Sequence, residues 1–439
     1  MDRRFSAAIT AICLCAPAIR AQAGDPGALQ CSSRVLRATT ARLQRYVYCV
    51  QPDGSTSGGP GSRNGILVLD IDRHFCFVKR IVTPMVAKVR QGVSGGAGMR
   101  GIAVCRETGR LFYSWHQGGK PGDDGAGCID LKTDEVVWER AYDFPCARIQ
   151  VSIDGKTLFM PCHWTDRKAR SFRTIDAATG KPGRACHTGT TWPKHPFIVH
   201  PDGRRLFYPG ACLDLRTGRL LWSERKVFKG NMHIVMDHTG TRLYTGRHRD
   251  AESVATWILD AASGEVVSKV PIDKQRHPDL RGISEVVAFE PGGGRFWGEA
   301  GQYMVRYDNS KSPPELVTIV DRDELNAKHG LKLTRSKGHA MVTGAGDYVW
   351  FSNGAVLEAA TGKYVCVMTA EDGRFTRGAK FVEVDWLDGR VLWAGQDECH
   401  GFIYRDYPIA RIRPLLSSDR LPRTPTAGPT DVPATSARP

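Results

Sequence analysis

The sequence predicts an all-β protein, a seven-bladed β-propeller with four antiparallel strands per blade. First, a short apolar run preceded by a Gly or Asp-Gly turn recurs along the chain, for example at 108–113, 154–159, 202–208 and 239–244. Second, an apolar run that ends in an acidic residue precedes a Thr/Ser-Gly turn at 175–181, 213–219, 259–265 and 357–363. Third, 47 Gly and 25 Pro indicate many turns and few long helices. Turns of this kind between β-branched and aromatic runs are typical of β-hairpins.

Each repeat therefore contains two hairpins, which is the strand arrangement of a propeller blade. One blade cannot bury both of its faces, so several blades must close into a ring. The number of blades depends on how the ends of the chain meet. Eight marker residues would give eight blades, but if the strand at 381–386 completes the first repeat the number is seven. We predict seven, with eight as the alternative; the markers are Tyr46, Leu111, Leu158, Leu206, Leu243, Phe296, Val349 and Leu392.

The two ends of the chain differ from the repeats. Arg3 and Arg4 precede a mostly apolar stretch at 5–19, and small residues follow at Ala21 and Ala23, which together indicate a signal peptide at 1–23. We expect a lead-in segment at 24–44, the propeller at 45–410, and a Pro/Thr/Ser-rich flexible tail at 411–439. The predicted location is therefore periplasmic or secreted.

Charge and cysteine usage narrow the function classes. Sixty-one Lys and Arg against 46 Asp and Glu give a net charge of +15, which suits an anionic partner. The predicted export and the lack of a dense Lys/Arg block argue against nucleic acid. No apolar run reaches the roughly 20 residues that a membrane-spanning helix needs. Of 13 Cys, two lie in the predicted signal peptide, so an odd number remains and complete internal pairing is not expected.

The repeated Asp-Gly-x-x-Leu-Tyr/Phe and Asp-x-x-Thr-Gly-Lys/Arg motifs resemble those of the YVTN/YncE-type exported bacterial propellers, part of the quinoprotein-dehydrogenase-like superfamily. The resemblance covers about residues 45–405 and implies a fold of seven or eight blades. Quinone-dependent dehydrogenases belong to the same superfamily. We find no repeated tryptophan-docking motif in this sequence, so a quinone cofactor is not expected.

Candidate binding residues lie where each innermost strand begins. In a propeller these starts share one face with the loops between the second and third strands, and ligands usually bind there. Counting back ten to twelve residues from each marker after Tyr46 reaches a charged or imidazole residue. These residues are Arg100, Arg148, His195, His233, Glu285, His339 and Lys380.

The order of these residues around the ring predicts two kinds of site. His195, His233, Glu285 and His339 follow one another and would suit a divalent metal ion, the one cofactor for which the sequence offers ligands. Arg100, Arg148 and Lys380 would become neighbours on ring closure and would suit an anion, because guanidinium groups bind carboxylates with two hydrogen bonds.

Loops expected on the same face add further candidates. Trp and His at a channel mouth suit stacking on sugars and hydrogen bonding to them. A solvated loop is the simpler interpretation of each one alone, but they recur at matching places. They are His116, His163, Trp164, His248 and His400.

We expect an exported propeller that binds an anionic ligand, either an acidic saccharide or a protein partner, on the face with the inner-strand starts. The alternative is a metal-assisted lyase or hydrolase of acidic saccharides, with His195, His233 and Arg148 as catalytic candidates. Propellers host both binding proteins and enzymes, so the fold does not decide between them. As an enzyme, a saccharide lyase or hydrolase is favoured over a quinoprotein dehydrogenase.

Overall fold

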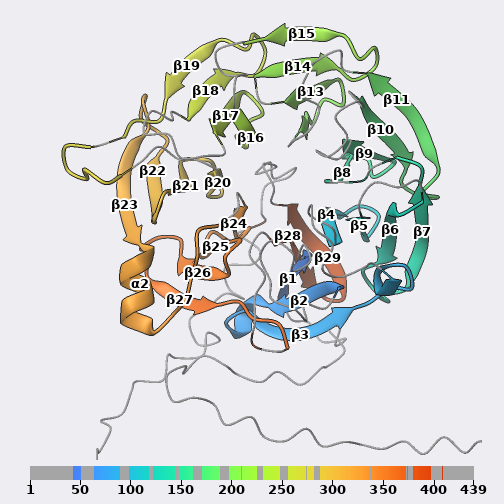
Figure 1. Cartoon of the computed structure of the whole chain (residues 1–439), viewed down its shortest axis with the longest axis horizontal. Coiled ribbons are helices and arrows are strands. Elements are labelled where there is room, and N and C mark those ends of the chain that lie inside the picture. The colour runs from blue at the N-terminus through green and yellow to red at the C-terminus, as the bar shows by residue number, and fades with distance from the viewer. Residues whose placement is uncertain are drawn as a thin grey trace, which may run out of the picture.

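Seven β-sheets form a ring around a central axis (Figure 1). This computed structural model describes residues 43–50, 64–88, 98–117, 122–144, 146, 148–161, 171–187, 197–208, 210–224, 231–247, 256–272, 274–280, 287–336, 339–371, 373, 379–396 and 408. The predicted seven-bladed propeller is confirmed, and the eight-bladed alternative is wrong.

Six of the sheets have the predicted four strands, each antiparallel to its neighbour. From the inside outward, blade 1 contains β4 (Gly98–Cys105), β5 (Arg110–His116), β6 (Asp124–Asp130) and β7 (Val136–Tyr142). Blade 2 contains β8 (Gln150–Val151), β9 (Thr157–Pro161), β10 (Ser171–Asp176) and β11 (Pro182–His187). Blade 3 contains β12 (Ile198–Val199), β13 (Arg205–Tyr208), β14 (Ala211–Asp214) and β15 (Leu220–Ser223).

The second half of the ring repeats this order. Blade 4 contains β16 (Asn231–Met236), β17 (Arg242–Arg247), β18 (Trp257–Asp260) and β19 (Val266–Lys269). Blade 5 contains β20 (Val287–Phe289), β21 (Arg295–Ala300), β22 (Tyr303–Asp308) and β23 (Glu315–Asp321). Blade 6 contains β24 (Ala340–Val342), β25 (Tyr348–Phe351), β26 (Ala355–Glu358) and β27 (Tyr364–Val367).

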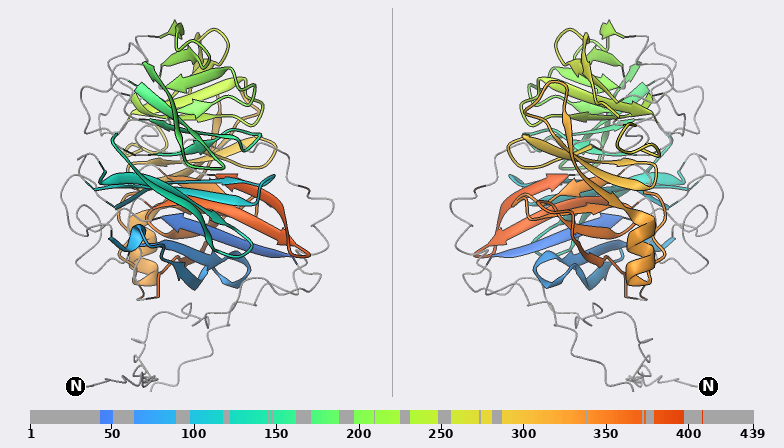
Figure 2. Two further views of the ribbon diagram at one scale, coloured as in Figure 1. Left: turned by 90° about the vertical axis from the view of Figure 1, so that its right-hand side faces the viewer. Right: turned by 90° about the vertical axis from the view of Figure 1, so that its left-hand side faces the viewer.

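The seventh sheet, which we call the closing blade, joins the two ends of the propeller. It is built from β1 (Gln44–Val50), β2 (Ile66–Asp70), β3 (Cys76–Ile81), β28 (Lys380–Leu387) and β29 (Arg390–Gln396). β28 pairs with β1 in an antiparallel register, so blue and orange-red strands lie side by side in Figure 2. β29 folds back on β28 as a fifth strand. Leu392, the eighth marker, lies in β29, which explains why eight copies of the motif make seven blades.

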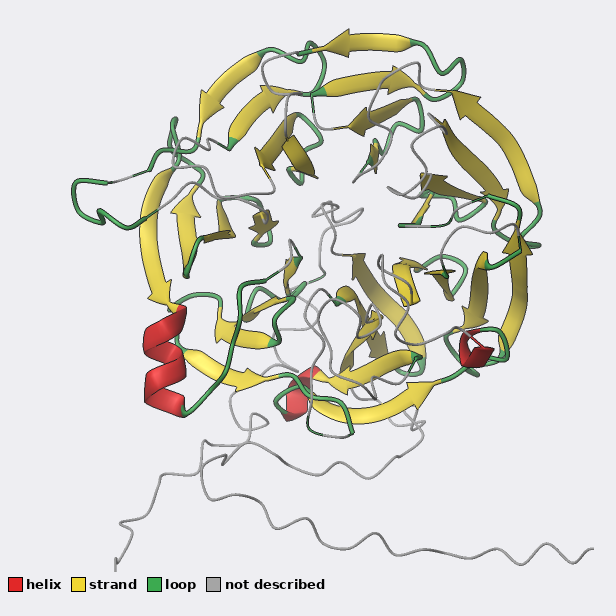
Figure 3. Cartoon of the chain, viewed as in Figure 1, coloured by secondary structure: helices red, strands yellow, loops and turns green. Residues whose placement is uncertain are grey.

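Helical segments within the described ranges are few and short (Figure 3). They are η1 (Ile71–Arg73), η2 (Val86–Lys88) and α2 (Arg322–His329). α2 follows β23, and the Asp321 carboxylate caps it by accepting hydrogen bonds from the backbone N–H groups of Asp323 and Glu324. None of the helices in the described ranges combines the length and the apolar character that a bilayer span requires.

The core is divided among the interfaces between neighbouring blades. Alternate residues of β28 illustrate the division, since successive strand residues point to opposite faces. Val382 and Val384 belong to a buried cluster that includes Ile102 of blade 1. Phe381 belongs to a different cluster, together with Trp350 of blade 6. Each blade thus buries one face against the blade before it and the other against the blade after it.

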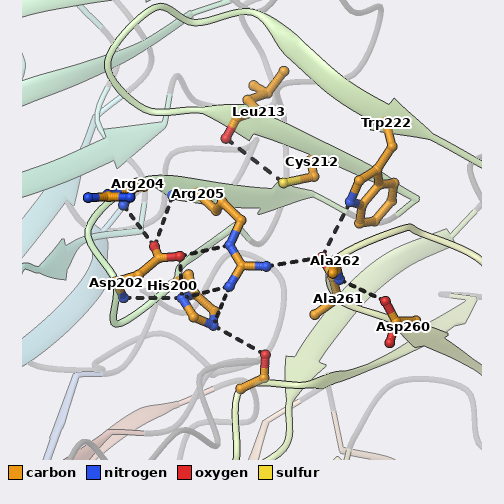
Figure 4. Close-up of polar contacts among 11 residues, drawn as sticks. His200, Asp202, Arg204, Arg205, Cys212, Leu213, Trp222, Asp260, Ala261 and Ala262 are labelled. Carbon is orange, nitrogen blue, oxygen red and sulfur yellow. Dashed lines mark hydrogen bonds and ion pairs between the residues drawn. The ribbon is translucent and has the colours of Figure 1, made fainter.

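Tryptophan side chains connect several blades through the Thr/Ser-Gly turns (Figure 4). In each case the indole N–H donates to an alanine carbonyl in the turn of the next blade. The pairs are Trp138 with Ala177 at 2.9 Å, Trp222 with Ala261 at 3.3 Å, and Trp297 with Ala359 at 3.2 Å. In the described part of the chain, these contacts do not form a motif repeated in every blade. Trp138 and Trp222 lie in outermost strands and Trp297 in a second strand, so they do not recur at one position of the repeat.

Glycines at the ends of the inner strands form a second set of contacts between blades. In four of these turns the glycine lies against a residue at or just after the end of the inner strand of the preceding blade. A Cβ atom at Gly155 would lie 2.6 Å from Cys105 Sγ, and one at Gly240 would lie 2.8 Å from His200 Nε2. The same relation joins Gly293 to His238 and Gly346 to Pro291. These four glycines have positive φ angles, so both the conformation and the close approach favour glycine.

Candidate functional site

Two predicted anion-binding residues meet where the closing blade contacts blade 1. Lys380 begins β28 and is 6% exposed. Its ammonium group donates to the backbone carbonyl of Arg100. Arg100 lies in β4 at a break in register between Met99 and Gly101, and its side chain is half-buried. Ring closure therefore brings together two cationic residues that are 280 positions apart in sequence.

Arg148 lies in the next blade along, two residues before β8, and is 8% exposed. The neighbouring Ile149 carbonyl accepts a hydrogen bond of 3.3 Å from the side-chain amide of Gln396, which ends β29. β29 thus reaches from the closing blade to the start of blade 2. The three cationic residues of the predicted anion site belong to consecutive blades, and we call Lys380, Arg100 and Arg148 the cationic arc.

A buried histidine–aspartate pair lies on the same side of blade 1. His116 ends β5 and pairs in register with Gly98, the residue that begins β4. His116 Nδ1 is 2.5 Å from Asp124 Oδ2, and both side chains are 1% exposed. His116, which the sequence suggested as a loop candidate, is therefore a buried residue at a strand end. Its burial argues against direct contact with a large ligand.

Asp124 also fixes the segment that leads to Arg148. Its carboxylate accepts hydrogen bonds of 2.9 Å from the backbone N–H groups of Gln117 and Cys146. Cys146 is fully buried and lies two residues before Arg148. Because Asp124 joins β6 to this segment, it links the second hairpin of blade 1 to the start of blade 2. The sequence signal for Asp124 is its place at the end of the Gly-rich loop that His116 opens.

The structure describes only some of the four predicted metal ligands. His195 and Glu285 lie outside the described residues. His233 lies in β16 opposite Gly246, but its side chain is also outside the described part. His339 directly precedes β24, is mostly buried, and its carbonyl accepts from Ser352 N at 2.7 Å. Among the described residues no group of three or more His, Cys, Asp or Glu could hold a metal ion, so the metal site stays a prediction.

The remaining loop candidates, His163, Trp164, His248 and His400, also lie outside the described residues. Their roles in sugar stacking and hydrogen bonding stay predictions.

A hollow lies at the opposite end of the inner strands. Its lining comes from the last residues of β4, the end of β8 and the middle of β29, and includes Cys105, Glu107, Ser152 and Trp393. Because Arg100 lies near the start of β4 and Cys105 at its end, this hollow and the cationic arc are on different faces of the ring. Its walls mix apolar groups with Arg106 and Glu107, so it has no marked preference for an anion.

Comparison with known proteins supports the fold. No protein-family model matches the chain, and no curated protein matches its sequence. The periplasmic gluconolactonase of Pseudomonas aeruginosa is similar in structure, with 13% identity, a TM-score of 0.50, and coverage of 77% of this chain and 99% of the gluconolactonase chain. A candidate 6-phosphogluconolactonase from Bacteroides uniformis has 10% identity, a TM-score of 0.50, and coverage of 77% and 99%. At such identities the likeness shows that the two structures and this chain share the β-propeller fold.

Proposed function

We propose that this protein is an exported propeller that binds an anionic ligand of the acidic-saccharide class at the cationic arc. The observation that carries the proposal is the meeting of Lys380 and Arg100 across the ring closure, with Arg148 on the next blade. Lys380 and Arg100 are 280 positions apart in sequence, so no local element of structure brings them together. Their juxtaposition depends on the ring alone.

Partial burial of Arg100 strengthens the case for an anion. Charges in a medium of low dielectric interact more strongly than charges in water, so the half-buried Arg100 guanidinium attracts an anion more than a fully exposed one would. The net charge of +15 would raise the local concentration of an anionic ligand before it docks. A guanidinium group also matches the geometry of a carboxylate, which is the acidic group of uronic and aldonic sugars. The named activities of the two similar lactonase folds concern sugar acids, and support the same class by analogy.

Cysteine chemistry supports the exported location. Cys76 is disulfide-bonded, and the other cysteines of the described ranges are buried. Disulfides persist outside the cytoplasm, where thiols are not kept reduced. This agrees with the signal peptide that the sequence predicts at 1–23.

The test is calorimetric titration of the purified chain with an oligogalacturonate and with a neutral oligosaccharide of equal length. We expect binding of the acidic oligomer only, with an affinity that falls as salt is raised. Losing one charge-assisted hydrogen bond costs roughly 1.5–3 kcal/mol. Arg100→Gln should therefore weaken binding by about ten-fold or more.

Arg204→Gln is the matched control, because Arg204 is exposed on blade 3, away from the cationic arc. It should leave the affinity unchanged. Equal affinity for the acidic and the neutral oligomer, or equal effects of the two substitutions, would refute the proposal.

A further inference from the structure

A buried polar cluster lies where the closing blade packs against blade 6. Arg45 of β1 is opposite Asp385 of β28 in the ring-closing ladder and is almost fully buried. Its Nε donates to Asp72 Oδ1 at 2.9 Å, and its Nη1 donates to Asp347 Oδ1 at 3.0 Å. Asp72 belongs to η1 of the closing blade, whereas Asp347 lies in the turn before β25 of blade 6. One guanidinium group thus holds two blades together.

Glu383 lies two residues before Asp385 on the same face of β28. Both side chains are 0% exposed. The Glu383 carboxyl accepts a hydrogen bond of 2.9 Å from the backbone N–H of Gly344, in the turn that also carries Asp347. The contact between Glu383 and blade 6 is therefore direct and lies beside the Arg45 bridge.

The groups that face Glu383 do not balance in charge. On β28 the neighbour is Asp385, on β1 it is Arg45, and on the turn of blade 6 it is Asp347. Asp72 is bound to the same guanidinium, and the Tyr348 phenol of β25 lies next to Asp347 and Arg45. The Arg45 guanidinium is bound to Asp72 and Asp347, which are partly exposed. Ionising Glu383 as well as Asp385 would place a second negative charge beside the first in the interior, where burial of a charge is costly.

We propose that this seam is a proton-dependent clasp, in which Glu383 keeps a proton when the ring is closed. The closing strand β28 is then held most tightly in acid and loosens as the pH rises. This inference concerns ring closure and is independent of the anion-binding proposal.

The direction of the pH dependence follows from linkage. Burial, and then the nearby Asp385 carboxylate, raise the pKa of Glu383 well above its ordinary value of 4.5. A group with a raised pKa in the folded state stabilises the fold fully below its unfolded pKa and loses that effect as the pH rises. One proton taken up on folding changes the unfolding equilibrium constant about ten-fold per pH unit in that interval.

A second carboxyl near the seam acts in the same direction. Burial, helped by Asp72, raises the pKa of Asp70 to about 6. Both Glu383 and Asp70 therefore contribute to the pH dependence of wild-type stability. Comparison with a variant at position 383 isolates the contribution of Glu383.

The test is urea unfolding of wild type and Glu383→Gln between pH 4 and pH 8. Gln is a neutral isostere that can still accept the Gly344 hydrogen bond. We expect similar stability at pH 4 and a growing advantage of the variant toward pH 8, by about ten-fold in the unfolding constant per pH unit. Glu135→Gln, at an exposed glutamate, is the control and should follow the wild type at every pH. A constant difference between wild type and Glu383→Gln would overturn the proposal.

Two further measurements test the clasp itself. At pH 8, amide hydrogen exchange in 380–387 should be faster in wild type than in Glu383→Gln, while exchange in 205–214 of blade 3 should be equal. Equal changes in both peptides would mean that no local clasp exists. If the variant does not fold, infrared spectroscopy of the wild type at pH 7 decides: a buried protonated carboxyl band is expected, and its absence overturns the proposal.

Discussion

Two glycines in equivalent turns offer a controlled measurement of how tightly the blades pack. Gly155 and Gly203 each follow an aspartate in the turn after an inner strand, with φ angles of +68° and +67°. Each N–H donates to the carbonyl three residues earlier, at 2.9 Å. The surroundings differ: a Cβ at Gly155 would lie 2.6 Å from Cys105 Sγ and 2.9 Å from Thr108 Cγ2, whereas a Cβ at Gly203 would meet nothing within 4 Å.

Substitution by alanine separates backbone strain from packing. Both variants incur the cost of a left-handed conformation, roughly 1–2 kcal/mol. Gly155→Ala also forces a methyl group against blade 1, and overpacking of this kind costs typically about 1–3 kcal/mol. We therefore expect Gly155→Ala to lower the free energy of unfolding by about 1–3 kcal/mol more than Gly203→Ala does.

Equilibrium urea unfolding, with one m value fitted to both variants, measures this difference. The unfolded-state effect of replacing glycine with alanine is nearly the same for the two positions and cancels in the comparison. Equal losses of stability would show that the turn of blade 2 does not press on Cys105, and the contact between neighbouring turns would have to be abandoned as a stabilising feature.

Three further predictions concern the repeated contacts. Trp138→Phe should lower the free energy of unfolding by at least about 0.5–1.5 kcal/mol, because the Ala177 carbonyl loses its indole donor; calorimetry of the variant measures the loss, and an unchanged melting temperature contradicts it. Hydrogen bonds from Thr217 lower the pKa of Asp214, so the ionised Asp214 stabilises the fold above the ordinary Asp pKa of 3.8 and this stabilisation is lost as the pH falls. The urea midpoints of Asp214→Asn and wild type should therefore converge from pH 5 to pH 3. A difference between the midpoints that does not change with pH would contradict a stabilising role for this turn. Alkylation of the native chain should spare the seven buried cysteine thiols of the described ranges and reach them only after unfolding, and rapid modification of the native chain would contradict this; they are Cys49, Cys105, Cys128, Cys146, Cys186, Cys212 and Cys366.

The fold could be predicted from the sequence because the hairpin turns repeat. The glycine of each Thr/Ser-Gly turn has a positive φ, as at Gly180 and Gly264, so the motif records a backbone requirement directly. The fifth strand of the closing blade could not be predicted, because the run at 390–396 has the same pattern as the second strands of the other blades. Only the pairing of β29 with β28 distinguishes it.

The candidate site could be predicted from the sequence only in part, for a related reason. Counting back ten to twelve residues from a marker does not fix the face on which a side chain lies. In the paired register Arg100 precedes Val104 by four residues, whereas Arg148 precedes Val151 by three. Since strand residues alternate between faces, the irregular backbone at Met99–Gly101 and before Gln150 decides where these side chains lie. Sequence spacing carries no information on such irregularities.

The charged cluster at the seam was missed because its members show no local motif. Arg45, Asp347 and Glu383 come from three separate segments that ring closure brings together. Each lies inside or beside an apolar strand, where a lone polar residue resembles ordinary surface alternation. Its signal could have been the unusual density of acidic residues in the strand at 380–387, which carries Glu383 and Asp385 between buried apolar residues.

The most direct test of the central claim is to locate the ligand on the two ends of one strand. Amide hydrogen exchange of the chain with and without oligogalacturonate should show added protection at 98–101, where Arg100 lies, and at 379–382, where Lys380 lies. The other end of β4, at 104–110, should be unaffected. Protection at 104–110 without protection at 98–101 would place the ligand on the opposite face and contradict the cationic arc as the binding site.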